Sequence, residues 1–241
     1  PSTKEIFNSS PFVDNTIIID KKGKHKTLIS TYKFVKELKK NNYSLLYSSH
    51  RSLRTSLIVL LMQIRESYGF DNSSLMHVYK NLIVYDSSKH EVQRNLDLVG
   101  FTYDDDNWKI LPKITAETQS IEKVNNFINQ NNLNDGFIAV SPGSVWNTKR
   151  YPLEYFEDVI KYFTDRNNKI VLIGGKDDKQ LCEKISSKFL KNVVNAADEF
   201  SIVESIQLLR SAKLLLSNEN IKDEDKARLL LIHLCSNGHI K

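Results

Sequence analysis

Cysteine and long apolar runs are both scarce in this chain of 241 residues. The two cysteines, Cys182 and Cys235, form no CxxC pair, and no histidine cluster accompanies them at metal-ligand spacing. A disulfide framework and a structural metal site are therefore not predicted, and reduced thiols in a cytosolic compartment are expected. No apolar run reaches the roughly 18 residues that span a bilayer, so no transmembrane segment is predicted. The first residues also carry no signal-peptide pattern.

Several familiar ligand-binding signatures are missing as well. Neither a GxGxxG fingerprint nor a P-loop occurs, and no solenoid repeat is visible. The net charge of +5 favours anionic partners, such as nucleotides, phosphorylated sugars, nucleic acid or an anionic membrane surface. Because the basic residues are interspersed with acids, a solvated lysine-rich surface is the simpler interpretation. No basic stripe with interleaved aromatic residues is present, which argues against a nucleic-acid partner.

The hydrophobic pattern of the first part of the chain predicts a mixture of strands and helices. Strands are expected at residues 13–20 and 44–47, and helices at residues 26–40, 52–66 and 90–98. Asp14 and Asp20 belong to the first of these strands and are expected to be structural. The periodicity lapses between residues 102 and 118, around an acidic turn. We therefore expect two domains, residues 1–115 and 116–241.

The second part alternates regularly between strand and helix. Strands are expected at residues 137–140, 169–173, 193–194 and 213–216. Helices are expected at residues 119–129, 152–166, 178–189 and 201–210. A repeated strand, loop and helix predicts a parallel sheet with helices on both faces, so the fold class is α/β.

The loop SPGSVWNTKRYP, which follows the strand at residues 137–140, is the first candidate binding site. Ligands of open α/β sheets bind at the carboxyl ends of strands, and free N–H groups at a helix start favour phosphate. Gly143 permits a tight turn or a close approach to a ligand, Ser144 offers a hydroxyl, and Lys149 carries a charge suited to a diphosphate. The alternative is a Pro-Gly turn with basic surface residues.

Two further loops follow strands at the same predicted edge. In IGGKDD, Gly175 permits close backbone approach, and Asp177 or Asp178 is suited to accept hydrogen bonds from ribose hydroxyls. The alternative is that one of these acids caps the following helix. In LSNE, Asn218 and Glu219 are polar candidates, with an ordinary polar loop as the alternative. Three such loops at one edge predict a nucleotide-sized cleft.

Three segments follow one another in the second part of the chain: PGSVWNTKRYP, VLIGG and NAADEFSIVESIQLLRSAKLLLSN. In this order they resemble the C-terminal half of the ADP-heptose:lipopolysaccharide heptosyltransferases, which form glycosyltransferase family 9. This likeness covers about residues 136–218. The earlier segments SPFVDNTIIIDKKGKH, SSHRSLRTS, ESYGF and HEVQRNLDLVG occur in the family's order. The loop PGSVW…KRYP favours the second heptosyltransferase of the pathway over the first.

The resemblance implies a fold of GT-B type, with two Rossmann-like domains of parallel sheets. It implies metal-independent transfer of heptose from ADP-L-glycero-D-manno-heptose to the lipopolysaccharide inner core, with no cofactor. Lys149 and Ser144 match the family's donor loop, and Gly143, Gly175, Asp178, Asn218 and Glu219 lie in the matching strand-end loops. Arg51 and Arg54 match the acceptor side, with a helix-start or surface role as the alternative. The acceptor would be a lipid-linked oligosaccharide, and the protein cytoplasmic or peripheral to the inner membrane.

The sequence also departs from the family. The family's general-base Asp stands in a loop upstream of the first residue here, so no catalytic residue is assigned, and both domains are expected to be incomplete. After Asn218 the family's Asp-Ser-Gly is not found, and a frameshifted or split gene is one hypothesis for the tail. The alternative function is therefore a non-catalytic relative that binds a nucleotide only.

Overall fold

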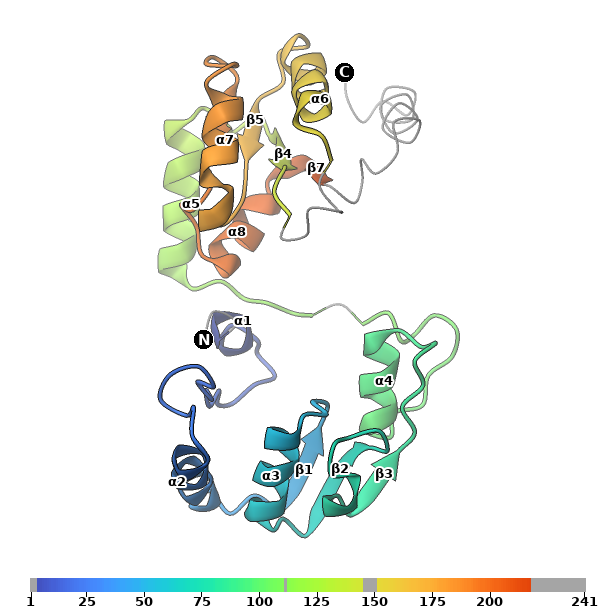
Figure 1. Cartoon of the computed structure of the whole chain (residues 1–241). Coiled ribbons are helices and arrows are strands. Elements are labelled where there is room, and N and C mark those ends of the chain that lie inside the picture. The colour runs from blue at the N-terminus through green and yellow to red at the C-terminus, as the bar shows by residue number, and fades with distance from the viewer. Residues whose placement is uncertain (1–3, 111, 145–150, 218–241) are drawn as a thin grey trace. The chain divides into compact units, whose positions relative to one another are not determined.

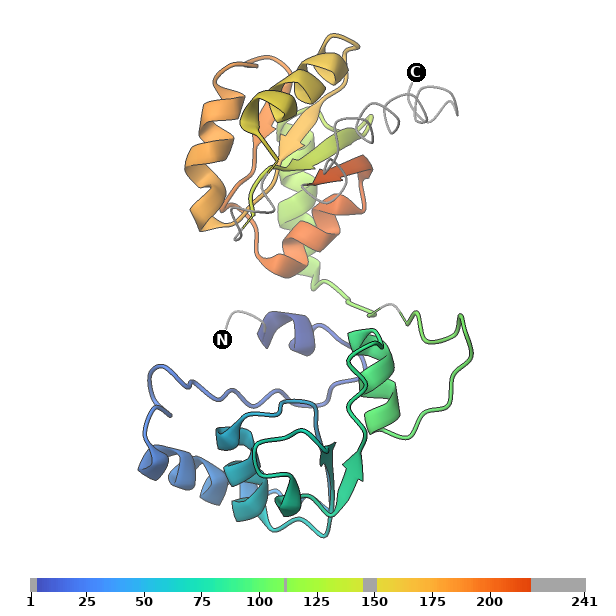
Figure 2. The ribbon, with the colours of Figure 1, turned by 45° about the vertical axis from the view of Figure 1, so that its right-hand side comes forward.

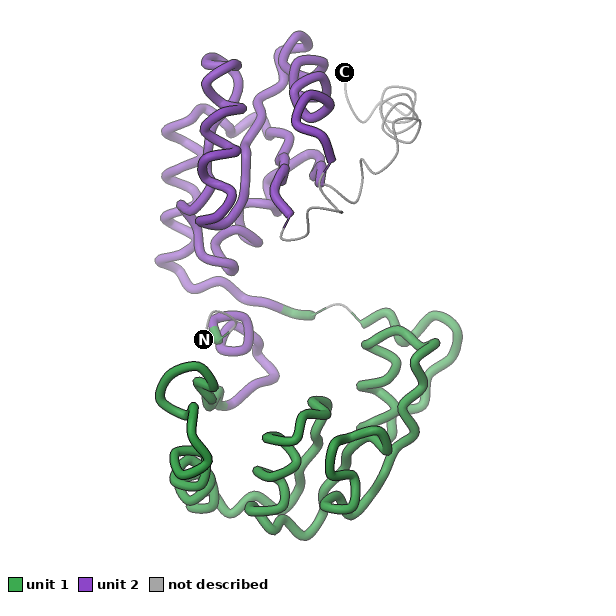
Figure 3. Tube along the Cα trace, viewed as in Figure 1, with its two compact units in different colours: residues 1–4, 15–113 green, residues 5–14, 114–241 purple. Residues whose placement is uncertain are grey.

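The computed structural model describes residues 4–110, 112–144 and 151–217. The chain divides into two compact units, which are coloured separately in Figure 3. Unit 1 consists of residues 1–4 and 15–113, and unit 2 consists of residues 5–14 and 114–241.

Unit 1 contains a parallel three-stranded sheet in the order β1-β2-β3 (Figure 1). Its strands are β1 (Leu45–Ser48), β2 (Glu66–Phe70) and β3 (Asn81–Ile83). Its helices are α2 (Leu28–Lys39), α3 (Leu53–Met62), α4 (Glu91–Leu98) and the short 3-10 helix η1 (Met76–Val78). The helix α2 begins at Thr27, whose side chain accepts the Ser30 N–H in a capping box.

The core of unit 1 is small. Val35 of α2, Met62 of α3 and Ile64 form one buried cluster, which joins α2 to α3. Phe70, at the end of β2, is also buried. A parallel sheet needs apolar side chains packed on both of its faces. Three short strands bury few side chains, so few apolar contacts stabilise this unit.

Unit 2 contains a parallel four-stranded sheet in the order β6-β5-β4-β7. Its strands are β4 (Phe137–Ser141), β5 (Ile170–Leu172), β6 (Val193–Asn195) and β7 (Ala212–Ser217). Its main helices are α5 (Thr118–Gln130), α6 (Leu153–Thr164), α7 (Lys179–Ser186) and α8 (Ile202–Leu209). Two short helices are α1 (Lys4–Asn8), most of which belongs to this unit, and the 3-10 helix η3 (Lys176–Asp178).

Helices cover both faces of this sheet because successive strand residues point to opposite sides. Ile138 and Val140 of β4 pack in one cluster with α6 and α7, whereas Phe137 and Ala139 pack in another with α5 and α8. Figure 2 shows the helices on either side of the strands. The four residues of β4 from Phe137 to Val140 are at most 1% exposed, so β4 is the centre of the unit.

The described structure confirms the expected α/β class with parallel sheets, but it corrects three details. Residues 13–20 form no strand; Asp20 begins a turn instead. The helix expected at residues 52–66 ends at Met62, and Leu60 is half exposed rather than covered. Glu66 already belongs to β2, which the sequence interpretation missed together with β3.

Residues 5–14 lie with unit 2, whereas the sequence placed them in the first domain. The Ser201 hydroxyl donates to the carboxylate of Glu5, and the Thr115 N–H donates to the carbonyl oxygen of Ser9. These hydrogen bonds attach the N-terminal segment to α8 and to the chain before α5.

Candidate functional site

The carboxyl ends of the strands of unit 2 meet at one edge of its sheet. Ser141 at the end of β4 is in register with Ser217 at the end of β7, and Val140 is in register with Leu172 at the end of β5. Parallel pairing therefore brings the ends of β4, β5 and β7, which precede the loops that the sequence singled out, to the same edge, and α/β sheets bind ligands at this edge.

Asp178 connects two of these loops. Its Oδ2 accepts the Gly175 N–H at 2.9 Å, so it caps the start of η3. A Cβ placed on Gly143 would be 1.9 Å from Asp178 Oδ1, and one on Gly174 would be 2.7 Å from Asp178 Cβ. Both glycines therefore make room for the side chain of Asp178, which brings the loop after β4 against the loop after β5.

The loop after β6 lies at the same edge, although the sequence interpretation did not include it. Asp198 donates its N–H to the carbonyl oxygen of Gly174 and has a left-handed backbone, with φ of 67°. The Ala197 N–H donates to Asn195 Oδ1. The signal in the sequence was the pair of polar residues Asn195 and Asp198 at and after the end of a short apolar strand, which is similar to the pattern used for the other loops.

The predicted donor-side residues fall into two groups. Gly143, Gly175 and Asp178 are brought together as described, and Ser144 follows Gly143 directly. Asp177 is exposed beside them, on the first turn of η3. Lys149, Asn218 and Glu219 lie outside the described residues.

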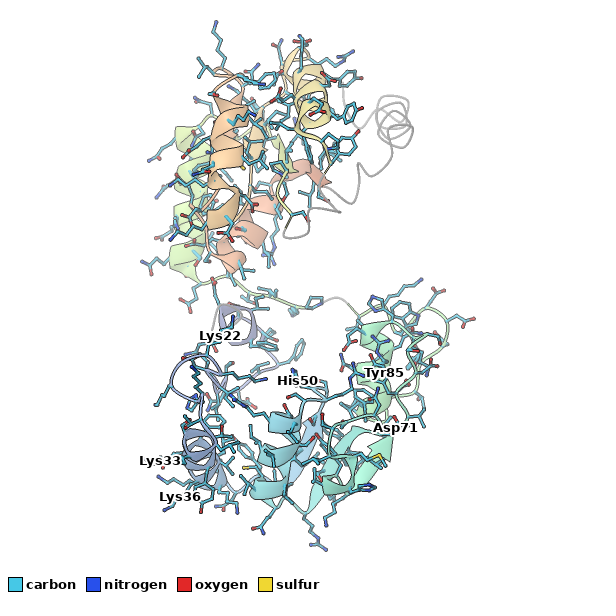
Figure 4. The ribbon with its side chains drawn as sticks, viewed as in Figure 1. Lys22, Lys33, Lys36, His50, Asp71 and Tyr85 are labelled. Carbon is cyan, nitrogen blue, oxygen red and sulfur yellow. The ribbon has the colours of Figure 1, made fainter. Side chains whose placement is uncertain are left out.

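Unit 1 gathers polar side chains at the carboxyl edge of its own sheet. His50 follows β1, Asp71 follows β2 and Tyr85 follows β3, and Figure 4 shows them on the side toward which the strands run. Asp71 Oδ1 accepts the Tyr85 N–H at 3.0 Å. His50 Nδ1 lies 3.4 Å from the backbone nitrogen of Ser52 and 3.2 Å from Thr55 Oγ1.

The two arginines expected on the acceptor side have different surroundings. The Arg51 guanidinium stacks 3.9 Å from the centre of the Tyr85 ring. Ser74 donates both its N–H and its hydroxyl to the Arg51 carbonyl oxygen. Arg54 instead donates to the carbonyl oxygens of His25 and Lys26, at 3.0 and 2.9 Å, and fixes the chain before α2. Arg51 thus belongs to the edge with His50, Asp71 and Tyr85, while the guanidinium of Arg54 is engaged in structure.

The described residues contain no group of three or more histidine, cysteine, aspartate or glutamate side chains placed to hold a metal ion. They also contain no helix long and apolar enough to cross a membrane. The side chains described at the two edges offer hydroxyls, carboxylates, guanidinium and imidazole groups, together with backbone N–H donors.

Residues 31–220 match the family model of glycosyltransferase family 9 (heptosyltransferase). This range covers most of the chain and includes both sheets. The chain therefore belongs to glycosyltransferase family 9. A search of curated protein sequences finds no match.

Solved structures show the same fold. A family 9 glycosyltransferase from Veillonella parvula superimposes with a TM-score of 0.79 at 17% identity, over 90% of this chain and 64% of that one. The Escherichia coli ADP-heptose lps heptosyltransferase II superimposes with a TM-score of 0.71 at 17% identity, over 89% of this chain and 66% of that one. The Escherichia coli heptosyltransferase WaaC with ADP superimposes with a TM-score of 0.62 at 12% identity, over 90% of this chain and 69% of that one. This chain thus spans slightly less than two thirds of the length of the first two.

Proposed function

We propose that this protein transfers a heptose from an ADP-activated donor to the inner core of lipopolysaccharide, without a metal ion or cofactor. The family match over residues 31–220, which contains the strand-end loops of both sheets, is the observation that carries the proposal. WaaC, a structural neighbour, is described with ADP and with an ADP-2-deoxy-2-fluoro heptose. The acceptor in this proposal is a lipid-linked oligosaccharide at a membrane surface.

The loops of unit 2 are suited to the donor. In this proposal the diphosphate lies against the N–H groups of the loop after β4, where Ser144 adds a hydroxyl and Lys149 a positive charge. As the bond to the sugar breaks, negative charge grows on the leaving diphosphate, and Lys149 stabilises that charge more than the charge of the ground state. The sugar becomes oxocarbenium-like at the same time.

Asp177 is the better candidate than Asp178 for the ribose hydroxyls. The Asp178 carboxylate already accepts the Gly175 N–H and lies against Gly143. Asp177 is exposed, and among the described residues its carboxylate has no hydrogen-bond partner. The edge of unit 1, with Arg51 and His50, offers donors to an anionic acceptor.

The donor site is tested by following thermal stabilisation of the whole chain with ADP and, in parallel, UDP. We expect ADP to raise the melting temperature and UDP to leave it unchanged. Lys149→Ala and Asp177→Asn should weaken the ADP effect, while Lys184→Ala serves as a surface control. Equal stabilisation by both nucleotides, or by neither, would refute the ADP site.

The transfer itself needs a separate measurement with ADP-heptose and a core acceptor. Release of ADP that depends on the acceptor supports the proposal. ADP binding without acceptor-dependent release would instead identify a family member that binds the nucleotide only.

A further inference from the structure

The segment from Asp20 to Lys40 contains eight lysines and only two acids. Its net charge of +6 exceeds the +5 of the whole chain, so the view that the basic residues are evenly scattered is wrong for this segment. In the structure it forms a turn at residues 20–26 followed by α2, and Figure 4 labels three of its lysines: Lys22, Lys33 and Lys36. Such a concentration of one charge on one element indicates an anionic partner.

The same helix exposes large apolar side chains. Leu28, Ile29 and Tyr32 are 70%, 71% and 58% exposed, and they lie close together in the first five residues of α2. Val35, which is buried against α3, lies seven residues after Leu28, so Leu28 borders the buried side of α2, whereas Tyr32 and Ile29 lie farther round toward the outer side. Lys33 and Lys36 follow on this outer side, at i+4 from Ile29 and from Tyr32. The outer surface of α2 therefore combines apolar and cationic side chains.

The turn before α2 holds further lysines in a defined position. The Asp20 carboxylate accepts the backbone N–H groups of Lys22, Gly23 and Lys24. His25 Nδ1 accepts the Asp20 N–H, and the His25 ring lies 4.7 Å from that of Phe34. The acid of this turn is thus engaged with backbone, and the side chains of Lys22 and Lys24 are exposed.

The lysine head groups are available. Among the described residues, the ammonium groups of Lys22, Lys24, Lys33 and Lys36 have neither an ion pair nor a hydrogen bond, whereas the nearby Glu37 pairs with Lys40 at 2.6 Å. A hollow of about 670 Å³ is lined by the apolar residues Ile17, Ile18 and Phe34 and by the charged residues Lys24, Lys33, Lys36 and Glu37.

We propose that the outer surface of α2 and the preceding turn dock on an anionic lipid surface. Leu28, Ile29 and Tyr32 would enter the interface between head groups and acyl chains, and the lysines would contact lipid phosphates. An amphipathic helix with apolar residues beside a cluster of lysines binds membranes in this way, lying in the plane of the interface. A nucleic acid or an acidic protein surface would contact the lysines but would give the three apolar side chains no apolar partner.

The biological purpose of this docking rests on the proposed function, since a lipid-linked acceptor lies in a membrane. The measurement of docking does not rest on the proposed function, because vesicle binding needs neither the donor nor the transfer reaction. Failure of vesicle binding with intact ADP stabilisation would overturn only the docking, and the reverse result would overturn only the donor site.

The test is co-sedimentation of the whole chain with vesicles of phosphatidylcholine alone and of phosphatidylcholine mixed with phosphatidylglycerol. We expect binding to the mixed vesicles only, weakened by added salt. Each lysine near an anionic surface contributes about fivefold to binding, so Lys33→Gln/Lys36→Gln should weaken binding roughly 25-fold. The matched control Lys184→Gln/Lys191→Gln, with the same change of charge in unit 2, should bind like the original chain.

The apolar contribution is tested separately. Leu28→Ser/Ile29→Ser should lower vesicle binding at least about tenfold, since insertion of large aliphatic side chains is lost. Leu190→Ser, which replaces a leucine that is 85% exposed in unit 2, is the control. Circular dichroism confirms that each variant is folded. Equal binding to both kinds of vesicle, or equal binding by the α2 variants and their controls, would overturn the proposal. So would a dimer that Leu28→Ser/Ile29→Ser converts to a monomer, because the surface would then bind a second copy.

Discussion

The carboxylate of Asp178 occupies the space that a side chain at residue 143 would need. A Cβ on Gly143 would lie 1.9 Å from Asp178 Oδ1 and 2.2 Å from Asp178 Cγ. Gly143 therefore serves the contact between two loops of the protein itself, whatever further contact it makes with a ligand.

Gly143→Ala should consequently destabilise unit 2. We expect a loss of roughly 1–3 kcal/mol in the free energy of unfolding, as for other overpacked sites, measured by denaturant titration. The overlapping atoms belong to the carboxyl group, so the loss should be clearly smaller when Gly143→Ala is introduced into Asp178→Ala. A cost that is the same in both backgrounds would contradict this account.

A second glycine is under the same constraint in unit 1. A Cβ on Gly69 of β2 would lie 2.5 Å from the ring of Tyr79, which is 5% exposed. The Tyr79 hydroxyl lies 3.2 Å from Ser48 Oγ and 3.5 Å from Ser56 Oγ, so the ring has little freedom to move. Gly69→Ala should cost roughly 1–3 kcal/mol in chemical denaturation. Tyr79→Phe, which removes only these hydrogen bonds, should cost about 1 kcal/mol.

The helix α8 depends on its first residue. The Ser201 hydroxyl accepts the Glu204 N–H, and the Glu204 carboxylate accepts the Ser201 N–H in return. Ser201→Ala should lower the free energy of unfolding by about 1 kcal/mol, because a capped N–H loses its partner. Ser201→Thr keeps a hydroxyl that accepts the Glu204 N–H and donates to Glu5, and it should recover much of this loss. Equal stability of the alanine variant and the original chain would disprove the role of the cap.

Cys182 should be unreactive in the folded protein. Burial, aided by the negative charges of Asp178 and Glu183, raises the pKa of its thiol from 9.0 to about 12. Thiol reagents react with the thiolate, so modification of Cys182 in a Cys235→Ser background should be slow at pH 7 and fast in denaturant. Because the folded pKa is raised, the stability that this thiol contributes is complete below about pH 9 and is lost as the pH rises toward 12. The Cys182→Ala variant should not show this loss of stability at high pH.

The turn that carries the lysines should resist acid. Hydrogen bonds from the N–H groups of Gly23 and Lys24 hold the pKa of Asp20 below its ordinary value of 3.8. The contribution of the Asp20 carboxylate is therefore present above pH 3.8 and is lost as the pH falls through its lower folded pKa. An NMR titration of the Asp20 side chain checks this. Asp14, which is exposed, serves as the comparison in the same spectrum.

Regular elements with a strong periodic pattern could be predicted from the sequence. The helices α5, α6 and α8 lie within about two residues of their expected bounds, because each alternates a buried and an exposed face. The strands β4 and β5 were also predicted, since their short apolar runs are bounded by turns. The short strands β2 and β3 were missed, because Glu66–Phe70 includes serine and glycine, and Asn81–Ile83 is only three residues long.

The error at residues 13–20 has a different cause. The run VDNTIIID has the composition of a strand, but β-propensity expresses packing against neighbouring strands rather than an intrinsic backbone preference. Within the described residues no strand pairs with it. Asp20 then uses its carboxylate for a turn, which competes with extended structure.

The candidate site was predictable where it follows from strand order and not where it depends on side-chain contacts. Parallel pairing alone places the carboxyl ends of β4, β5 and β7 at one edge. The engagement of Asp178 with Gly143 and Gly175 joins residues from different loops, so only the structure could distinguish capping from an acid left free for a ligand. The edge formed by Asp71 and Tyr85 could not be predicted once β2 and β3 had been missed.

The attachment of residues 5–14 to unit 2 makes that unit discontinuous along the chain, with the core of unit 1 inserted between its two parts. A ribosome therefore completes unit 1 before most of unit 2 exists, and β4 must wait for β7 before its second edge is paired. Until unit 1 is folded, it is a flexible loop of about a hundred residues that the hydrogen bond between Ser9 and Thr115 must close, at an entropic cost that rises with the logarithm of loop length. Destabilising substitutions in unit 1 should accordingly loosen the N-terminal segment of unit 2 through chain connectivity alone.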